Sequence, residues 1–324
     1  EGLCTDKNTL IISCFGYCNS VCEHNHQHGK SPHIYLTQDV LGLDTVTINA
    51  ERKKEGGTEA IAQIQMKKAE IRLNPGQSLA SVISEQQGVT FASAGNNVQL
   101  PVIHGLYGNR ILVLNNGLKH GFQNWGADHA PEIDISSANT ITILKGAAGV
   151  RYGPEALGGA IVIEPNPLHL KESFYAEIGT GFQTNGNGMN ANFELGEGLE
   201  KWSYFLNGAF VKIGDKNAPD YNLTNSGKEE KSFGIGTRYH LENLDFKLYY
   251  SFVDQNLALL RSSVAESGSA FVRAINADRP LFIRPFSFAI NEPNHLINHH
   301  LVKAEVNWWY SDEGKLTFIA GRQL

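Results

Sequence analysis

From residue 173 onward, apolar and polar side chains alternate along segments of about ten residues. In the first segment every second residue from Phe174 to Phe182 falls on one face, and Tyr175, Glu177 and two glycines fall on the other. A period of two residues predicts β-strands with one apolar and one polar face. Seven such segments follow one another, at 174–182, 189–196, 202–210, 233–241, 244–252, 302–310 and from 316 onward.

Two features distinguish these strands from an ordinary antiparallel sheet with one wet face, which is the alternative interpretation. The polar faces carry charges and glycines, whereas the apolar faces end in Trp or Tyr. The connections also tend to alternate between short (197–201, 242–243, 311–315) and long (213–230, 254–299), although the first connection, 183–188, is short. This arrangement predicts a transmembrane β-barrel, and seven strands leave a barrel of even strand number incomplete.

The residues before 173 lack this regular alternation of apolar and polar positions. Residues 61–165 predict a mixed α+β domain, with a short helix over 79–86 after Pro75-Gly76. Four β-prone runs between Gly/Asn turns predict its strands, at 101–103, 111–114, 140–144 and 159–163. Residues 9–17 and 34–36 predict two further short strands, and the charged, Gly-ended segment 51–57 predicts a flexible linker.

Composition narrows the functional classes. The 324 residues contain 27 Lys+Arg and 33 Asp+Glu, and no basic cluster interrupts this mild acidity, so we expect no nucleic-acid partner. No GxSxG, HExxH or P-loop motif is present, so we expect no enzyme. No apolar run approaches the ~20 residues of a membrane-spanning helix. Because the sequence begins with Glu and ends inside a strand-like run, we expect an internal piece of a longer protein.

Three motifs carry a family resemblance, at 100–105, 109–117 and 141–163. The last, ITILKGAAGVRYGPEALGGAIVI, combines a strand, a Lys-Gly turn, a Tyr-Gly turn and a Gly-Gly pair, and with the other two it resembles the plug domain of TonB-dependent outer-membrane receptors. The resemblance implies an α+β plug followed by the antiparallel strands of an incomplete transmembrane barrel. The residues that match the plug pattern are Arg110, Lys145, Gly146, Arg151, Tyr152, Gly153, Gly158 and Gly159.

Within this resemblance, Arg110, Lys145 and Arg151 are expected to face an acidic barrel wall. The chain departs from the family at three positions: His104, Asn116 and Ala147 stand where the family usually has Arg, Asp and Pro. The first two substitutions weaken any salt-bridge interpretation at those positions.

The segment before the plug is similar to a TonB box, a peptide that adds an edge strand to the periplasmic protein TonB. The residues implied in this contact are Asp44, Thr45, Val46, Thr47 and Ile48, and a plain linker strand is the alternative. Residues 1–40 resemble the tail of a carboxypeptidase-regulatory-like β-sandwich, a short remnant carried by 13–17 and 34–36. The resulting domains are 1–40, the TonB box and linker at 41–60, the plug at 61–165 and the first strands of the barrel at 173–324.

All four cysteines lie in the first 22 residues, beside a cluster of histidines. Thiolate and imidazole suit Zn²⁺ and copper ions, so this segment predicts metal capture. The candidate ligands are Cys14, Cys18, Cys22, His24, His26, His28 and His33. An incidental polar loop with a local disulfide is the alternative.

In the plug, His120, Asp128 and His129 resemble the apical loop of zinc-type receptors and are candidate substrate contacts; loop packing, with Asp134 capping a turn, is the alternative. His295, His299 and His300 are further candidates.

Together these resemblances imply TonB-dependent transport across the outer membrane of a Gram-negative bacterium, with the plug and N-terminal segment toward the periplasm. The expected partners are TonB, outer-membrane lipid and a metal ion or metal chelate, and no cofactor is required. Zinc or copper is the expected cargo; the alternatives are iron–siderophore, haem and cobalamin. A soluble metal-binding or adhesion β-protein is the alternative class.

Overall fold

The computed structural model describes residues 8–12, 20–24, 63–121, 131, 133–263, 267–311 and 314–324. The chain divides into two units, residues 1–59 and residues 60–324, which are described separately. The described part of the first unit is an antiparallel hairpin of β1 (Asn8–Ile12) and β2 (Ser20–His24), in which Leu10 lies opposite Cys22. Part of the Cys/His-rich segment, Ser20–His24, therefore forms a strand.

The plug (residues 63–165) is built around a five-stranded sheet with the order β3-β8-β9-β6-β7. Its strands are β3 (Gln63–Lys67), β6 (Ile111–Asn115), β7 (Leu118–Lys119), β8 (Ala138–Lys145) and β9 (Gly159–Pro165). β6 and β9 are parallel, and the other pairs are antiparallel. A second hairpin, β4 (Val89–Ala94) with β5 (Val98–Ile103), packs beside it. The predicted strands of the plug correspond to β5, β6, β8 and β9.

Two short helices complete the plug core. α1 (Lys68–Ile71) follows β3 directly, and α2 (Leu79–Ile83) begins at Ser78, whose hydroxyl accepts a hydrogen bond from the Ser81 N–H at 3.1 Å. This is the N-cap arrangement that satisfies an otherwise unpaired helix donor. α2 buries Leu79, Val82 and Ile83 against Ile141, Ile143 and other aliphatic side chains of the sheet. The predicted helix over 79–86 therefore exists but is shorter.

The β6–β7 turn explains one departure from the family pattern. Asn116 and Gly117 both have positive φ, 50° and 75°, as the central residues of a type I′ turn require. Asn is among the few non-glycine residues that enter this region at low cost. The substitution at Asn116 therefore keeps the turn; His104, before Gly105, has the same backbone conformation (φ 49°).

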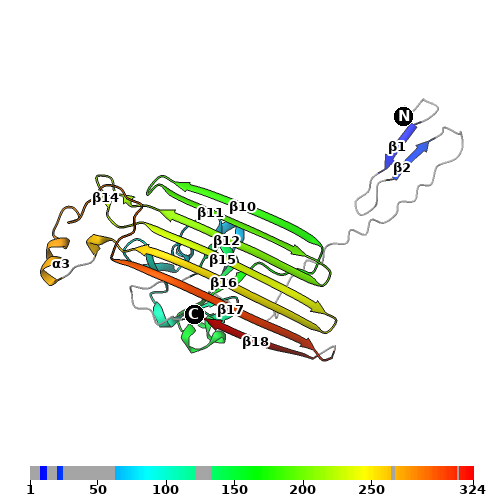
Figure 1. Cartoon of the computed structure of the whole chain (residues 1–324). Helices are drawn as coiled ribbons and strands as arrows, with labels where there is room; N and C mark the ends of the chain where they lie inside the picture. The colour runs from blue at the N-terminus through cyan, green and yellow to red at the C-terminus, as the bar shows by residue number, and fades with distance from the viewer. Residues whose placement is uncertain are drawn as a thin grey trace. The chain divides into compact units, whose positions relative to one another are not determined.

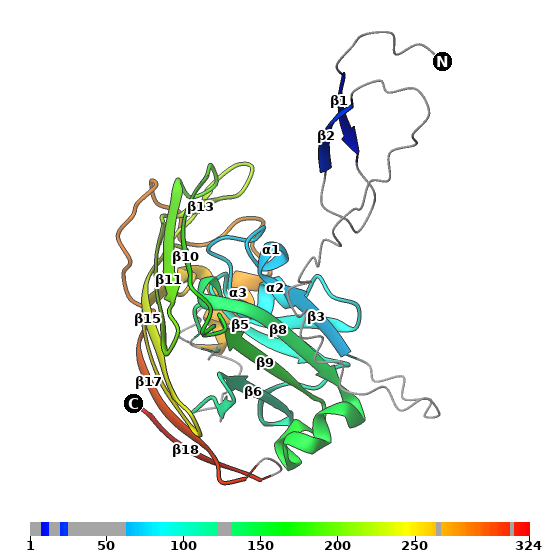
Figure 2. The same cartoon turned by 90° about the vertical axis from the view of Figure 1, so that its right-hand side faces the viewer.

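The second half of the unit is one antiparallel sheet of seven strands, which we call the wall. Its strands, in order, are β10 (Ser173–Gln183), β11 (Gly188–Gly198), β12 (Trp202–Ile213), β15 (Lys228–Leu241), β16 (Leu244–Ala258), β17 (Asn294–Trp309) and β18 (Lys315–Gln323) (Figure 1). The wall curves around the plug, whose strands and helices lie on its concave side (Figure 2). Among the described residues β10 pairs with β11 and β18 with β17, and the sheet does not close.

These features confirm the predicted fold class, an α+β domain followed by the antiparallel strands of an incomplete barrel. Several strands are longer than predicted, because β15, β16 and β17 include 228–232, 253–258 and 294–301. In the segment Lys228–Ser232 both faces are polar, so the alternation that marks a strand disappears although the backbone ladder continues.

The two long connections lie at the same end of the wall. The first contains β13 (Lys216–Asn217) and β14 (Asn222–Leu223), and the second contains η5 (Arg261–Ser263) and α3 (Gly268–Ile275). Among the described helices none is sufficiently long and apolar to cross a membrane.

Candidate functional site: the contact between plug and wall

The two faces of the wall have opposite character. On the convex face large apolar side chains are exposed, among them Ile178 (80% exposed) and Leu296 (75%). On the concave face several polar side chains are almost fully buried, namely Glu194, Ser203, Asn207, Asp245, His299 and Asn307. A soluble sheet has the reverse arrangement, with its apolar face covered. The alternative of a soluble sheet with one wet face is therefore wrong.

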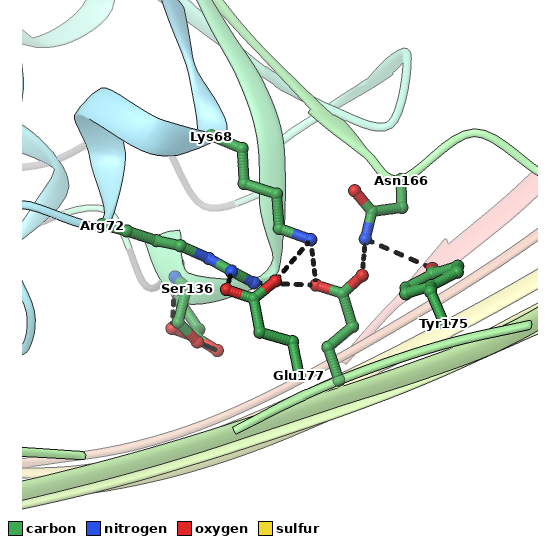
Figure 3. Close-up of polar contacts among 8 residues, drawn as sticks. Lys68, Arg72, Ser136, Asn166, Tyr175 and Glu177 are labelled. Atoms are coloured by element: carbon green, nitrogen blue, oxygen red, sulfur yellow. Dashed lines mark hydrogen bonds and ion pairs between the residues drawn. The ribbon is translucent and has the colours of Figure 1, made fainter. Parts of the chain in front are cut away.

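The polar contact begins where the plug chain first meets the wall. Lys68 and Arg72, from α1 and the residue after it, extend to two glutamates on neighbouring wall strands (Figure 3). The Lys68 Nζ lies 2.7 Å from an oxygen of Glu194 on β11 and 3.9 Å from Glu177 on β10. Arg72 forms an ion pair with Glu177 and lies 3.4 Å from Glu194. Two cations of the plug thus share two carboxylates of the wall.

Glu194 is the centre of this cluster because it is 3% exposed and its two oxygens are bound by different segments. Asn166, in the connection between plug and wall, donates its amide N–H to the other carboxylate oxygen and lies 3.4 Å from the Tyr175 hydroxyl (Figure 3). Lys68 also sits over the Tyr175 ring, 5.8 Å from its centroid. Burial lowers the pKa of Arg72, and the charge of Glu194 opposes this effect. Lys68, Arg72 and Asn166 together offset the cost of burying the negative charge of Glu194.

A cavity of about 250 Å³ lies beside the cluster, between the plug and β10–β12. Arg72, Asp134, Glu177, Asn190 and Glu230 contribute polar atoms to its lining. The contact is therefore not a continuous dry interface, and there is room for side chains of the plug to move against the wall.

Two further contacts attach the plug to the wall nearer the end that carries the two long connections. Asp134 begins η2 (Ile135–Ser137) and accepts the Ser136 N–H at 2.8 Å, and its other oxygen accepts the hydroxyl of Ser232 on β15. Asn97, at the tip of the β4–β5 hairpin, donates to the carbonyl oxygens of Ser226, Gly227 and Ala258 at 3.2, 2.8 and 3.0 Å. The predicted capping role of Asp134 is therefore present, together with a contact to the wall that the sequence did not indicate.

A third contact joins the end of β7 to β17 and β18. The rings of His120 and His299 face each other with centroids 4.7 Å apart. The Gln323 side chain accepts the Gly121 N–H at 2.5 Å and donates to the Lys119 carbonyl at 2.7 Å. His120 is completely buried, so in this conformation it faces the wall rather than the solvent.

The plug lies on the concave face of a wall whose convex face is apolar. Comparisons with known proteins agree with this arrangement. Residues 57–160 match the model of the TonB-dependent receptor plug domain. These residues therefore form a TonB-dependent receptor plug domain. Such receptors are outer-membrane proteins of Gram-negative bacteria that need no cofactor, and the matched proteins are transporters and receptors rather than enzymes.

Sequence relatives include receptors and transporters of the same kind, and solved structures share the fold. The vitamin B12 transporter BtuB of Vibrio vulnificus (strain CMCP6) is 25% identical over 252 residues, which cover 75% of this chain and 37% of that protein. The hemoglobin and hemoglobin-haptoglobin-binding protein C of Haemophilus influenzae is 26% identical over 169 residues, 47% of this chain and 15% of that protein. The matched residues therefore span little more than a third of the vitamin B12 transporter's length and less of the hemoglobin-binding protein's.

Among solved structures, the copper transporter OprC superposes with a TM-score of 0.61 at 14% identity, over 81% of this chain and 37% of that one. The siderophore receptor PirA from Acinetobacter baumannii gives 0.59 at 15% identity, over 81% and 39%. At these identities the likeness establishes the fold of the receptor alone.

The basic residues of the plug motif have varied environments. The Lys145 ammonium donates to the Gln87 carbonyl inside the plug, and Arg151 stacks on Tyr152, 5.0 Å from the ring centroid. Arg110 is exposed. A contact of these residues with an acidic wall stays a prediction. Lys68 and Arg72, which do reach wall carboxylates, were missed; their spacing of four residues directly after the linker was the available signal.

The glycines of the motif have a clear structural reason. Gly159 begins β9 with φ +144°, and a Cβ at this position would collide with the Leu144 backbone carbonyl of β8. At Gly158 a Cβ would lie 2.9 Å from the Leu106 Cβ. The Gly-Gly pair therefore lets β9 enter the sheet between β8 and β6.

The remaining predicted site residues lie outside the described residues or are described only in part. Cys22 and His24 belong to β2, and among the described residues no group of three or more His, Cys, Asp or Glu is placed to hold a metal ion. The predicted residues outside the described part are Asp44 to Ile48, Cys14, Cys18, His26, His28, His33, Asp128 and His129.

Proposed function

We propose that the receptor imports a scarce nutrient across the outer membrane with energy delivered by TonB, and that its plug and N-terminal segment face the periplasm. The observation that carries the proposal is the plug, held by polar contacts on the concave face of a wall whose convex face is apolar (Figure 2). Such a plug occludes a pore until work moves it, so transport requires no covalent chemistry.

The order of elements suggests how the work acts. Residues 44–48, the proposed TonB-binding segment, precede β3, which is the edge strand of the plug sheet and pairs with β8 alone. Immediately after β3 come Lys68 and Arg72 with their wall partners. Force applied at the N-terminal side therefore reaches the five residues of strand pairing first and the ion pairs next, before it reaches the rest of the plug.

The ion pairs help to keep the plug closed when no force acts. Glu194 is buried, but Lys68, Arg72 and Glu177 stay partly exposed, so separating them costs less than the ~3–5 kcal/mol of a fully buried pair. In this proposal TonB supplies that cost.

For the cargo we propose a transition-metal ion, zinc or copper, supported by the cysteines and histidines of residues 14–33 and by His120. The second candidate is a metal chelate such as cobalamin, because several sequence relatives are vitamin B12 transporters. Haem and iron–siderophore complexes belong to the same candidate class.

Uptake in cells tests the proposal. The full receptor is expressed in a Gram-negative host, and uptake of labelled zinc, copper and cobalamin is measured for Thr47→Pro, which removes a backbone donor from the proposed added strand. Uptake should fall at least tenfold while surface binding persists, and Glu55→Pro in the linker should behave as wild type. Uptake that is insensitive to Thr47→Pro and to an uncoupler would refute the proposal.

A further inference from the structure

The receptor holds two buried imidazoles across the boundary between its plug and its wall. His120 follows β7 and is 0% exposed; His299 lies on the concave face of β17 and is 3% exposed. Leu118 and Leu301, their neighbours two residues away, pack together with Phe205 and Tyr249 in an apolar cluster.

The pair brings imidazole nitrogens from two parts of the chain to one place at the boundary between plug and wall. Neutral imidazole is a preferred ligand of zinc and copper. Two such rings side by side therefore supply donors that a metal ion can use.

The distance between the rings fits a shared metal ion. A ring nitrogen binds Zn²⁺ at ~2.0–2.1 Å, which places each ring centroid about 3.2 Å from the ion. Two such rings at about 90–110° around one ion have centroids about 4.5–5.2 Å apart. The observed separation is 4.7 Å, with the ring planes inclined by 49°.

A third side chain is already in position. The Gln323 Oε1 lies 3.3 Å from the His299 Nε2, and its orientation is fixed by bonds to Gly121 and to the Lys119 carbonyl. An amide oxygen beside two imidazoles gives an uncharged N₂O set, which suits zinc or copper better than Ca²⁺ or Mg²⁺. The fourth position of a tetrahedral ion would remain for an exogenous ligand.

We propose that His120 and His299, together with Gln323, form a transition-metal site that bridges the plug and the wall. The site itself stands on this geometry, and its role as a cargo station rests on the proposed function. Because one imidazole belongs to each body, movement of the plug separates the ligands and lowers the affinity. The same displacement that opens the path would thus release the ion.

Metal titration of the purified full receptor in detergent tests the site. Zn²⁺ and Cu²⁺ binding is measured for wild type, His120→Ala and His299→Ala. The control is His240→Ala, a wall histidine on β15 whose Nδ1 lies 3.5 Å from an oxygen of Asp245 and which is not among the candidate ligands. Each site variant should lose one equivalent or at least tenfold in affinity, and the control should bind as wild type.

Metal binding by the N-terminal segment must be removed, because it would add to the binding measured at the proposed site. All measurements are therefore repeated with its candidate ligands replaced, by Ser for Cys14, Cys18 and Cys22 and by Asn for His24, His26, His28 and His33. In this background, Cu²⁺ electron paramagnetic resonance of the otherwise unaltered receptor should show coupling to imidazole nitrogen. This second measurement does not depend on the folding of the alanine variants.

The outcomes separate the two proposals. Binding that is equal in wild type, His120→Ala and His299→Ala, or a copper spectrum without nitrogen coupling, would overturn the metal site while leaving TonB-dependent uptake intact. Uptake unaffected by Thr47→Pro together with intact metal binding would instead refute the proposed function alone.

Discussion

Glu194 shows how much of the plug–wall contact depends on single side chains. Its buried carboxylate binds Lys68 and Arg72 at the two ends of α1 and Asn166 in the connection between plug and wall. Glu194→Gln keeps the shape and loses the charge, so we expect the plug to be held less firmly by about 2–3 kcal/mol, discounted because both cations remain partly exposed.

Hydrogen exchange of residues 63–75 in the purified receptor measures this change. Glu197→Gln is the control, since Glu197 lies on the same strand but bonds to the Tyr204 hydroxyl at 2.7 Å. Equal exchange rates in the two variants would show that the ion cluster does not secure the plug.

Gly159 illustrates a constraint of the backbone. We expect Gly159→Ala to destabilise the plug by roughly 2–4 kcal/mol, because the new Cβ collides with the Leu144 carbonyl in a conformation that L-residues avoid. Gly105→Ala, at φ +79° with no atom within 4 Å of the added Cβ, should cost only about 1 kcal/mol. Protease resistance of the plug against temperature distinguishes the variants, and a smaller loss at Gly159 would contradict the packing explanation.

These residues also show what the sequence could and could not reveal. The glycine pattern was visible because a backbone constraint acts on its own residue and neighbours. The Lys68–Glu194 contact joins residues 126 positions apart in the sequence. A local sequence pattern cannot predict a contact between residues so far apart. His120 and His299 were each noticed as histidines, but only the fold brings their rings together.

At the scale of elements, the side-chain amide of Asn97 links the β4–β5 hairpin to the wall through hydrogen bonds. Asn97 is buried and donates to three carbonyl oxygens at the ends of β15 and β16. We expect Asn97→Ala to cost about 1–3 kcal/mol, the penalty for leaving buried acceptors unpaired. The loss should appear as faster hydrogen exchange around 95–98 and 226–227.

Asn96→Ala serves as the control for this prediction, because Asn96 is more exposed than its neighbour. If both variants exchange alike, the hairpin is held by Val98 and its apolar contacts with Leu257 rather than by the amide.

Strands were predictable where their two faces differ and not elsewhere. The wall strands were found because their outer positions are apolar and their inner positions polar. β3 and β4 were missed, since Gln63–Lys67 and Val89–Ala94 are short and contain mixed residues on both faces. The helix α3, with residues 268–275 in the longest connection, was missed as well. Short elements depend on their tertiary neighbours more than on their own pattern.

At the scale of the whole molecule, the convex face of the wall behaves as a surface for lipid. Between Phe233 and Leu241 on β15 the outward residues are mostly apolar over about 26 Å of strand at ~3.3 Å per residue. Charges gather beyond one end of this band, where Lys212 and Lys231 flank Glu229 at 3.0 and 2.8 Å. Aromatic residues such as Trp202 and Tyr239 stand near the other end.

A charge placed in this band should be costly according to its depth. We expect Ile235→Arg to destabilise the membrane-inserted receptor by about 2–4 kcal/mol and Leu241→Arg, near the aromatic end, by about 0–1 kcal/mol. Equilibrium unfolding from lipid vesicles measures both. Equal costs at the two positions would mean that this face does not lie in hydrocarbon.

The marginal place of β3 in the plug has a consequence for leakage. When β3 leaves, the four strands β8-β9-β6-β7 stay paired, and the central core loses only Met66 and the partly buried Ile64. The remaining sheet is then a ready template, on which a short strand can re-form in about 1–10 μs, the time of hairpin formation. In the proposed transport cycle the pore would therefore reseal almost as soon as tension ends, which would limit the escape of periplasmic solutes.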